Sequence, residues 1–163
     1  MQREKKRVAD SRVTLSALMG PQDANGHGNV HGGVIMKMVD ETGALVAMRH
    51  ARAPVVTVAI DSMSFMKPIF VGSLVRCDAE LTFVGRTSME VRVIVSMENP
   101  LTGDTDVTNT AYLVYVALAD DGNPTLVPEL LLESPEEVLR ASEAEQRQAY
   151  RKQQRAQEKA HIR

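Results

Sequence analysis

Residues 23–41 read DANGHGNVHGGVIMKMVDE, a turn rich in glycine, asparagine and histidine that leads directly into an apolar segment. No proline and few polar residues interrupt residues 33–51, and this segment is about 28 Å long if it is helical, at about 1.5 Å per residue. Its apolar side chains lie on all sides of the helix, which is typical of a buried helix. The sequence therefore predicts one buried helix that carries two carboxylates, Asp40 and Glu41.

Segments in which apolar and polar residues alternate follow and precede this helix, and they predict β-strands. In residues 74–83, Val75, Cys77 and Leu81 alternate with charged or polar residues, as expected for a strand with one buried face. The short sequence GRTS and the loop NPLTGD would connect neighbouring antiparallel strands. The expected strand segments are residues 12–19, 55–65, 74–83, 89–98 and 106–119. We therefore predict an α+β fold in which an antiparallel sheet of five or six strands wraps around the buried helix.

The composition indicates one globular domain and excludes several classes of function. The chain has 163 residues, of which 44% are hydrophobic, and its formal net charge is −2, so it offers no basic surface for nucleic acid. A single cysteine excludes an intrachain disulfide, and no run of about 18 or more apolar residues is present to span a membrane. We expect a cytoplasmic protein that neither binds nucleic acid nor inserts into a membrane.

The chain divides into three parts by composition. Residues 1–10 are charged and contain no regularly spaced apolar residues, so we expect a loose N-terminal tail. Residues 11–130 would form the folded domain. Residues 131–163 predict a charged helix that is solvated or bridges subunits, with Ser134 as its N-cap and Glu137 completing a capping box.

Three stretches of the chain carry a resemblance to a known family. They are GNVHGGVIMKMVDE at residues 28–41, FMKPIFVG at residues 65–72 and ENPLTGDTDVTNTAYLVYVAL at residues 98–118. These stretches are similar to the acyl-CoA thioesterases of the brain acyl-CoA hydrolase and YciA type, and the order of elements resembles their hotdog fold. The resemblance implies hydrolysis of fatty acyl-CoA to free fatty acid and coenzyme A, without a cofactor, by a dimer that assembles into a trimer of dimers.

Hydrolysis of a thioester requires hydrogen-bond donors for the developing oxyanion and a base or nucleophile. Gly32 and Gly33, with His31 at the helix entry, would supply free N–H groups and bind the substrate. Asp40 lies eight residues beyond Gly32, about 12 Å along the helix axis, so one helix cannot hold both groups on one carbonyl. We therefore predict a site shared by two identical subunits whose central helices lie side by side. The resemblance implies the same arrangement, with Asp40 as the acidic catalytic residue and Asn25 as its partner from the facing subunit.

Coenzyme A carries phosphate groups, which require cations and exposed N–H donors. Arg86, Thr87 and Ser88, in the short connection VGRTS, form one candidate set for contact with coenzyme A. Lys67, which stands beside a proline, is a second candidate. An ordinary charged hairpin is the structural alternative for both.

Other interpretations of the same residues remain open. Asp40 can equally be a structural carboxylate paired with Lys37 one turn earlier, and Glu41 pairs with Lys37 more readily than it takes part in catalysis. His27 and His31 are four residues apart but lack a third ligand at a matching spacing, so no metal site is predicted. A hotdog hydratase or dehydratase would use His31 with a carboxylate, and a non-catalytic acyl-CoA-binding protein would keep the pocket alone. Release of free coenzyme A distinguishes these functions from hydrolysis.

Overall fold

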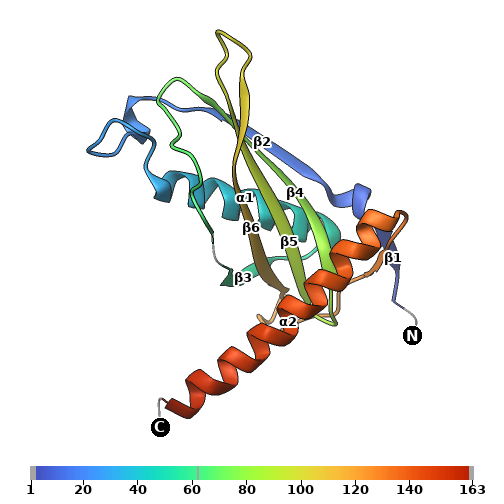
Figure 1. The fold of residues 1–163 in the computed structure, drawn as a ribbon. Coiled ribbons are helices and arrows are strands. Elements are labelled where there is room, and N and C mark those ends of the chain that lie inside the picture. The colour runs from blue at the N-terminus through green and yellow to red at the C-terminus, as the bar shows by residue number, and fades with distance from the viewer. Residues whose placement is uncertain (1–2, 62, 162–163) are drawn as a thin grey trace.

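The computed structural model describes residues 3–61 and 63–161 (Figure 1). A five-stranded antiparallel sheet, with strand order β2-β4-β5-β6-β3, curls around helix α1. A separate pair of parallel strands joins β1 to β7. In chain order the elements are β1 (Lys5–Arg7), a 3₁₀ helix (Val8–Ser11), β2 (Val13–Leu18), a 3₁₀ helix (Pro21–Asp23), α1 (Gly32–Ala51), β3 (Val55–Ile60), β4 (Leu74–Val84), β5 (Ser88–Glu98), β6 (Thr105–Ala117), β7 (Glu129–Leu131) and α2 (Pro135–His161).

The hydrophobic core lies between the sheet and α1. Val91, Val93 and Val95 of β5 are fully buried, and they belong to the same apolar cluster as Ile35 and Val46 of α1. The residues between them in β5 point to the other face of the sheet, as the period of a strand requires. The α+β fold and the central helix predicted from the sequence are therefore confirmed.

One side of α1 is not covered by the sheet. Met36, Leu45 and Met48 lie on this side and are 43%, 40% and 37% exposed, respectively. The prediction of a helix buried on every side is therefore wrong for the single chain, because the sheet packs against one side only. None of the helices in the described residues is long and apolar enough to cross a membrane. This side of α1 therefore exposes three large apolar side chains beside the charged pair of Lys37 and Glu41, a combination that is typical of a contact between subunits.

The N-terminal residues do not form a loose tail. Strand β1 pairs in parallel with β7, and Arg3 donates hydrogen bonds to the carbonyl oxygens of Gly85 (2.6 Å) and Val127 (3.3 Å). The prediction for residues 1–10 is thus wrong in its described part, because backbone pairing fixes this segment without any apolar pattern that the sequence could reveal. Residues 1–2 lie outside the described residues.

Helix α2 lies on the outer face of the sheet, opposite α1 (Figure 1). Its predicted cap is present, since the N–H of Glu137 donates to Ser134 Oγ at 3.2 Å. Arg147 and Arg151 bind the carboxylate of Glu90 on β5, a residue that is 1% exposed. A buried ion pair needs complete hydrogen bonding to be tolerated, and the two guanidinium groups provide it. These contacts dock one side of α2 on the sheet, and most of its other side chains are exposed, as expected for a solvated helix. A role of α2 in bridging subunits stays a prediction.

His50, in the last turn of α1, is a buried titratable group. Its Nε2 lies 3.0 Å from the carbonyl oxygen of Pro128, and its Nδ1 has no hydrogen-bond partner in the described part of the chain. Burial lowers the pKa of His50; the hydrogen bond to Pro128 opposes this effect, Lys6 lowers the pKa further, and Glu4 and Asp10 raise it. The folded protein therefore favours the neutral imidazole.

We expect the protein to lose stability as the pH falls below about 6.5, the pKa of histidine in an unfolded chain. A group whose pKa is lowered by folding stabilises the fold fully above its unfolded pKa, and this contribution is lost as the pH falls toward the folded pKa. His50→Gln keeps an amide donor for Pro128 but cannot take up a proton, so it should flatten the dependence of the unfolding midpoint on pH between about pH 5 and 8. An unchanged pH dependence in this variant would assign the acid sensitivity to other groups.

Candidate active site

Asn25 is held in the loop that precedes α1 by its own backbone and side-chain hydrogen bonds. Its Oδ1 accepts hydrogen bonds from the N–H groups of His27 (2.9 Å) and Asn29 (3.2 Å), and its N–H donates to the Asn29 carbonyl at 2.7 Å. Within the described residues, Nδ2 of Asn25 has no acceptor. Because the amide oxygen is occupied, Asn25 can meet a ligand as a hydrogen-bond donor.

The entry of α1 presents one free N–H group rather than two. His31 is the N-cap residue, and its Nδ1 accepts a hydrogen bond from the N–H of Gly33 at 2.9 Å. The Gly33 N–H is therefore not the free oxyanion donor that we expected, because the side chain of His31 caps it. No acceptor faces the N–H of Gly32 among the residues that the structure describes. This single N–H lies at the positive end of the helix dipole, where negative charge is favoured.

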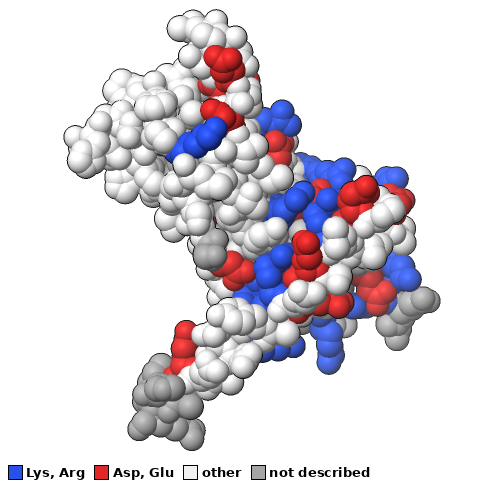
Figure 2. Space-filling model, viewed as in Figure 1, with Lys and Arg blue, Asp and Glu red and all other residues white. Residues whose placement is uncertain are grey.

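Asn25, Gly32 and Lys67 line one cavity of about 260 Å³ beside the helix entry. The ring of Phe65 lies against Gly32, where an added Cβ would be 3.3 Å from the ring atom Cζ. The other lining residues are Asn29, Val30, Ile35, Pro68 and Ile69. Figure 2 shows that charged side chains gather over the outer face of the sheet and α2, whereas the end of the molecule that carries the Asn25 loop is nearly uncharged. The cavity thus brings the polar residues Asn25, Asn29 and Lys67 together with apolar side chains.

Asp40 lies in the middle of α1, on the side that faces β3 and β6. Thr57 Oγ1 donates a hydrogen bond to Asp40 Oδ1 at 2.8 Å. The hydroxyl of Tyr115 lies 3.1 Å from the same oxygen and 3.0 Å from the backbone carbonyl oxygen of Asp40. In the described part of the chain no hydrogen bond reaches Oδ2. One carboxylate oxygen is anchored, and the other is free to act as a base or a nucleophile.

Thr57 and Tyr115 were not among the predicted site residues. Thr57 is the one polar residue in the strand sequence VVTVAI, and it hydrogen-bonds to Asp40 of α1 although it is exposed in the single chain. Tyr115 occupies an inward position of β6 between the apolar residues Leu113 and Ala117. A buried tyrosine usually hydrogen-bonds through its hydroxyl, and this rule was the available signal.

Glu41, the second carboxylate of residues 23–41, has a structural partner. Lys37 Nζ lies 3.7 Å from Glu41 Oε1, an ion pair one turn apart on the exposed side of α1. This is the pairing that we expected for Glu41. The alternative interpretation, in which Lys37 pairs with Asp40, is not what the structure has, since hydroxyl groups bind that carboxylate instead.

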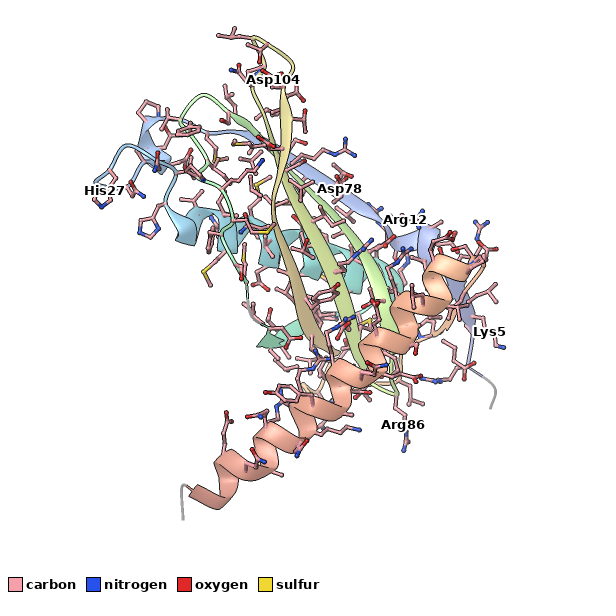
Figure 3. All side chains as sticks on the ribbon, in the orientation of Figure 1. Lys5, Arg12, His27, Asp78, Arg86 and Asp104 are labelled. Carbon is pink, nitrogen blue, oxygen red and sulfur yellow. The ribbon has the colours of Figure 1, made fainter. Side chains whose placement is uncertain are left out.

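The predicted site residues fall into separate groups within one chain. Asp40 is absent from the residues that line the Asn25 cavity, as the distance along α1 requires. The connection of Arg86, Thr87 and Ser88 lies at the end of the molecule opposite His27 and hence opposite the Asn25 loop (Figure 3). In one chain, the structure therefore brings Asn25, Gly32 and Lys67 together. Asp40 and the connection at residues 86–88 lie apart from this cavity.

Two other kinds of chemistry find no support in the described residues. Burial raises the pKa of the Cys77 thiol to about 11, an effect to which Asp78 adds and which a hydrogen bond with Thr42 opposes. Cys77 is fully buried in the core, so it is not an available nucleophile. No group of three or more His, Cys, Asp or Glu side chains in the part of the chain described could hold a metal ion.

Comparison with known proteins identifies the family. The thioesterase superfamily matches residues 27–103. The chain is 36% identical over 143 residues to the uncharacterized acyl-CoA thioester hydrolase YkhA of Bacillus subtilis, and the match covers 88% of this chain and 83% of that protein. It is 35% identical to the cytosolic acyl coenzyme A thioester hydrolase of Rattus norvegicus, where the match covers 86% of this chain but spans 37% of the length of the rat protein.

Solved structures agree with this family. The acyl-CoA hydrolase of Staphylococcus aureus, solved in complex with butyryl coenzyme A and coenzyme A, has a TM-score of 0.89 and 35% identity, covering 97% of this chain and 96% of that one. Variants of the same enzyme with an aspartate, an asparagine or a threonine replaced by alanine have also been solved. An apo-hexameric acyl-CoA thioesterase has a TM-score of 0.90 and 37% identity, covering 94% of this chain and 98% of that one.

These matches confirm the resemblance that the three sequence stretches indicated. They also confirm that the relatives are enzymes of the hydrolase class. The chain belongs to the thioesterase superfamily, among its acyl-CoA thioester hydrolases, and has their hotdog fold.

Proposed function

We propose that the protein hydrolyses acyl-CoA to a free fatty acid and coenzyme A at a site built from two copies of the chain. The carboxylate of Asp40 carries this proposal. It is partly buried in an apolar surrounding, one of its oxygens is fixed by two hydroxyl groups, and the other is free. A carboxylate held in this way is suited to act on a water molecule or on the thioester carbonyl itself.

The Asn25 cavity would hold the carbonyl that Asp40 acts on. Asn25 and Gly32 line the same cavity, and within the described residues neither Asn25 Nδ2 nor the Gly32 N–H has an acceptor, so both would be available to stabilise the negative oxygen that forms during attack. The bond between the acyl carbon and sulfur then breaks, and coenzyme A leaves as a thiolate that takes up a proton. Water is the only other reactant, and we propose no cofactor.

A second copy would bring the two half-sites together. The free edge of β3 carries the exposed side chains of Val56, Val58 and Ile60. Helix α1 lies on the concave side of the sheet (Figure 1), and Met36, Leu45 and Met48 are exposed on it. A twofold axis here would extend the sheet through β3 and set the entry of one α1 beside the middle of the other. The hexameric state of a relative with 37% identity supports an oligomer, and a trimer of dimers is the assembly that we propose.

Coenzyme A would extend from the cavity toward the solvent. Lys67 lines the cavity, so it is the cation best placed to bind a phosphate group, which would compete with its ion pair to Asp106. Arg86, Thr87 and Ser88 lie far from this cavity in the same chain, so they would contact coenzyme A only from another copy. We also propose a cytoplasmic location, which the cytosolic relatives support.

Several observations favour hydrolysis over the alternative reactions. A hydratase would need His31 as an acid or base, and the hydrogen bond from Gly33 to its Nδ1 leaves only Nε2 for that role. The residue types replaced in the variants of the S. aureus enzyme, an aspartate, an asparagine and a threonine, are those of Asp40, Asn25 and Thr57. A thiol-release assay with acyl-CoA of several chain lengths tests the activity directly.

We expect Asp40→Asn to lower the turnover of acyl-CoA by at least about 100-fold, because the amide keeps the shape of the side chain but cannot act as a base or nucleophile. Thiol release measures this effect, and the thermal unfolding midpoint should change little. Glu41→Gln is the matched control, since it removes a carboxylate from the adjacent position of the same helix and should retain turnover. Normal thiol release by Asp40→Asn would refute the proposed role of Asp40.

A mixture of two inactive variants tests the shared site. Asn25→Ala and Asp40→Asn are each expected to be inactive, but co-refolding would form hybrid dimers with one intact and one doubly altered site. Random pairing makes about half of the dimers hybrid, so activity should return to roughly a quarter of the wild-type level. Each variant refolded alone is the control. If native mass spectrometry shows hybrids and no activity returns, the two residues act within one chain.

A further inference from the structure

Tyr115 is the second hydroxyl group at Asp40, and its position in the sheet is shared with Thr57. The two residues are direct partners across the β3–β6 pair, so both side chains point inward at the same level. The register of these strands shifts immediately after Thr57, between Thr57 and Ala59. A bulge at this point re-aims the strand next to the proposed catalytic residue, as bulges near active sites commonly do.

Helix α1 makes room for the Tyr115 hydroxyl at one position. A Cβ added to Gly43 would lie 2.4 Å from the hydroxyl oxygen and 3.1 Å from two ring carbons of Tyr115. Gly43 does not have a positive φ, so the backbone conformation does not require glycine here. Glycine inside a helix destabilises the helix relative to alanine. The close approach of Tyr115 explains why glycine, and not alanine, occupies position 43.

The Tyr115 hydroxyl stays protonated and is therefore a permanent hydrogen-bond donor. Its side chain is fully buried, and its pKa is raised by burial, by the charge of Asp40 and by the hydrogen bond to Asp40. The phenol therefore stays protonated whenever Asp40 is ionised. Its one proton can be donated to the carboxylate or to the backbone carbonyl of Asp40, and both acceptors belong to the same residue.

We propose that Tyr115 is a positioning residue for catalysis, seated against Gly43, that fixes Oδ1 of Asp40 together with Thr57 and so aims Oδ2 at the reacting centre. This inference rests on the proposed function, since it gives Tyr115 a role only if Asp40 acts on the thioester. Tyr115 itself does not touch the substrate. A carboxylate with one anchored oxygen cannot rotate freely, so the free oxygen keeps its geometry between turnovers.

The test is Tyr115→Phe, which removes the hydroxyl and keeps the ring. We expect kcat to fall on the order of 10-fold, with KM within about twofold, because a hydrogen bond to a charged group is lost at the catalytic carboxylate and not at the binding surface. Tyr112→Phe is the matched control: Tyr112 lies on the same strand, but its ring faces α2, where Arg147 packs 3.8 Å from the ring centroid. This control should retain kcat. Unchanged kcat in Tyr115→Phe, or a rise in KM at constant kcat, would overturn the proposal.

Gly43→Ala provides a second test that keeps the hydroxyl. The new methyl group would displace the Tyr115 hydroxyl from Asp40, so kcat should fall in the wild-type background, whereas in the Tyr115→Phe background it should fall much less. A full kcat in Gly43→Ala would overturn the proposal even if Tyr115→Phe does not fold. Asp40→Asn, measured in parallel, separates the two claims. If the wild-type protein releases no thiol from acyl-CoA, the proposed function fails; if Asp40→Asn retains turnover, the proposed role of Asp40 fails; if Asp40→Asn is inactive while Tyr115→Phe is fully active, only the positioning role fails.

Discussion

The hydrogen bonds that Thr57 and Tyr115 make to one oxygen of Asp40 are the interaction on which the site depends. They connect the middle of α1 to two paired strands, and therefore require the helix, the strand register and the bulge after Thr57 to be in place together. An ionised carboxylate in an apolar surrounding is costly unless hydrogen bonds stabilise it. Two hydroxyl groups provide this stabilisation while leaving the second oxygen unoccupied, which is what a base or nucleophile needs.

The length of the helix imposes the second constraint. Gly32, at the helix entry, and Asp40 are separated by about 12 Å along α1, so we propose that one chain holds two half-sites that cannot act on one carbonyl. In the proposed dimer, the exposed side of α1 and the edge strand β3 would contact the second copy, which would join these halves. The outer face of the sheet is covered differently, by α2 and the buried carboxylate of Glu90. The outer face of the sheet therefore packs against α2, whereas the side that carries α1 is the one on which we propose assembly and catalysis.

Much of the fold could be predicted from the sequence, because apolar residues recur at regular spacing wherever one face of a helix or strand is buried. The alternation in β4 and β5 and the apolar run after Gly32 gave the sheet and its central helix. The pairing of β1 with β7 was not predictable, since three backbone-paired residues and the bonds of Arg3 leave no apolar pattern. The exposure of one side of α1 was not predicted either, because apolar residues give the same sequence pattern whether a sheet or another subunit covers them.

The site was predictable in part for similar reasons. Asp40 and Gly32 stand out as a carboxylate within an apolar helix and a glycine at its entry. Thr57 and Tyr115 do not, because only the tertiary structure shows that two strand residues far apart in sequence meet at one carboxylate. The substrate-binding role of His31 stays a prediction, and its side chain also caps the N–H of Gly33.

The most direct measurement of the two-copy site is a crystal structure of the Asp40→Asn variant with an unhydrolysed acyl-CoA bound. The account predicts that the thioester oxygen lies within hydrogen-bond distance of Asn25 Nδ2 and the Gly32 N–H of one copy. It also predicts that the carbonyl carbon faces position 40 of the other copy. A thioester bound beside position 40 with both groups from the same chain, or bound away from position 40 altogether, would contradict it.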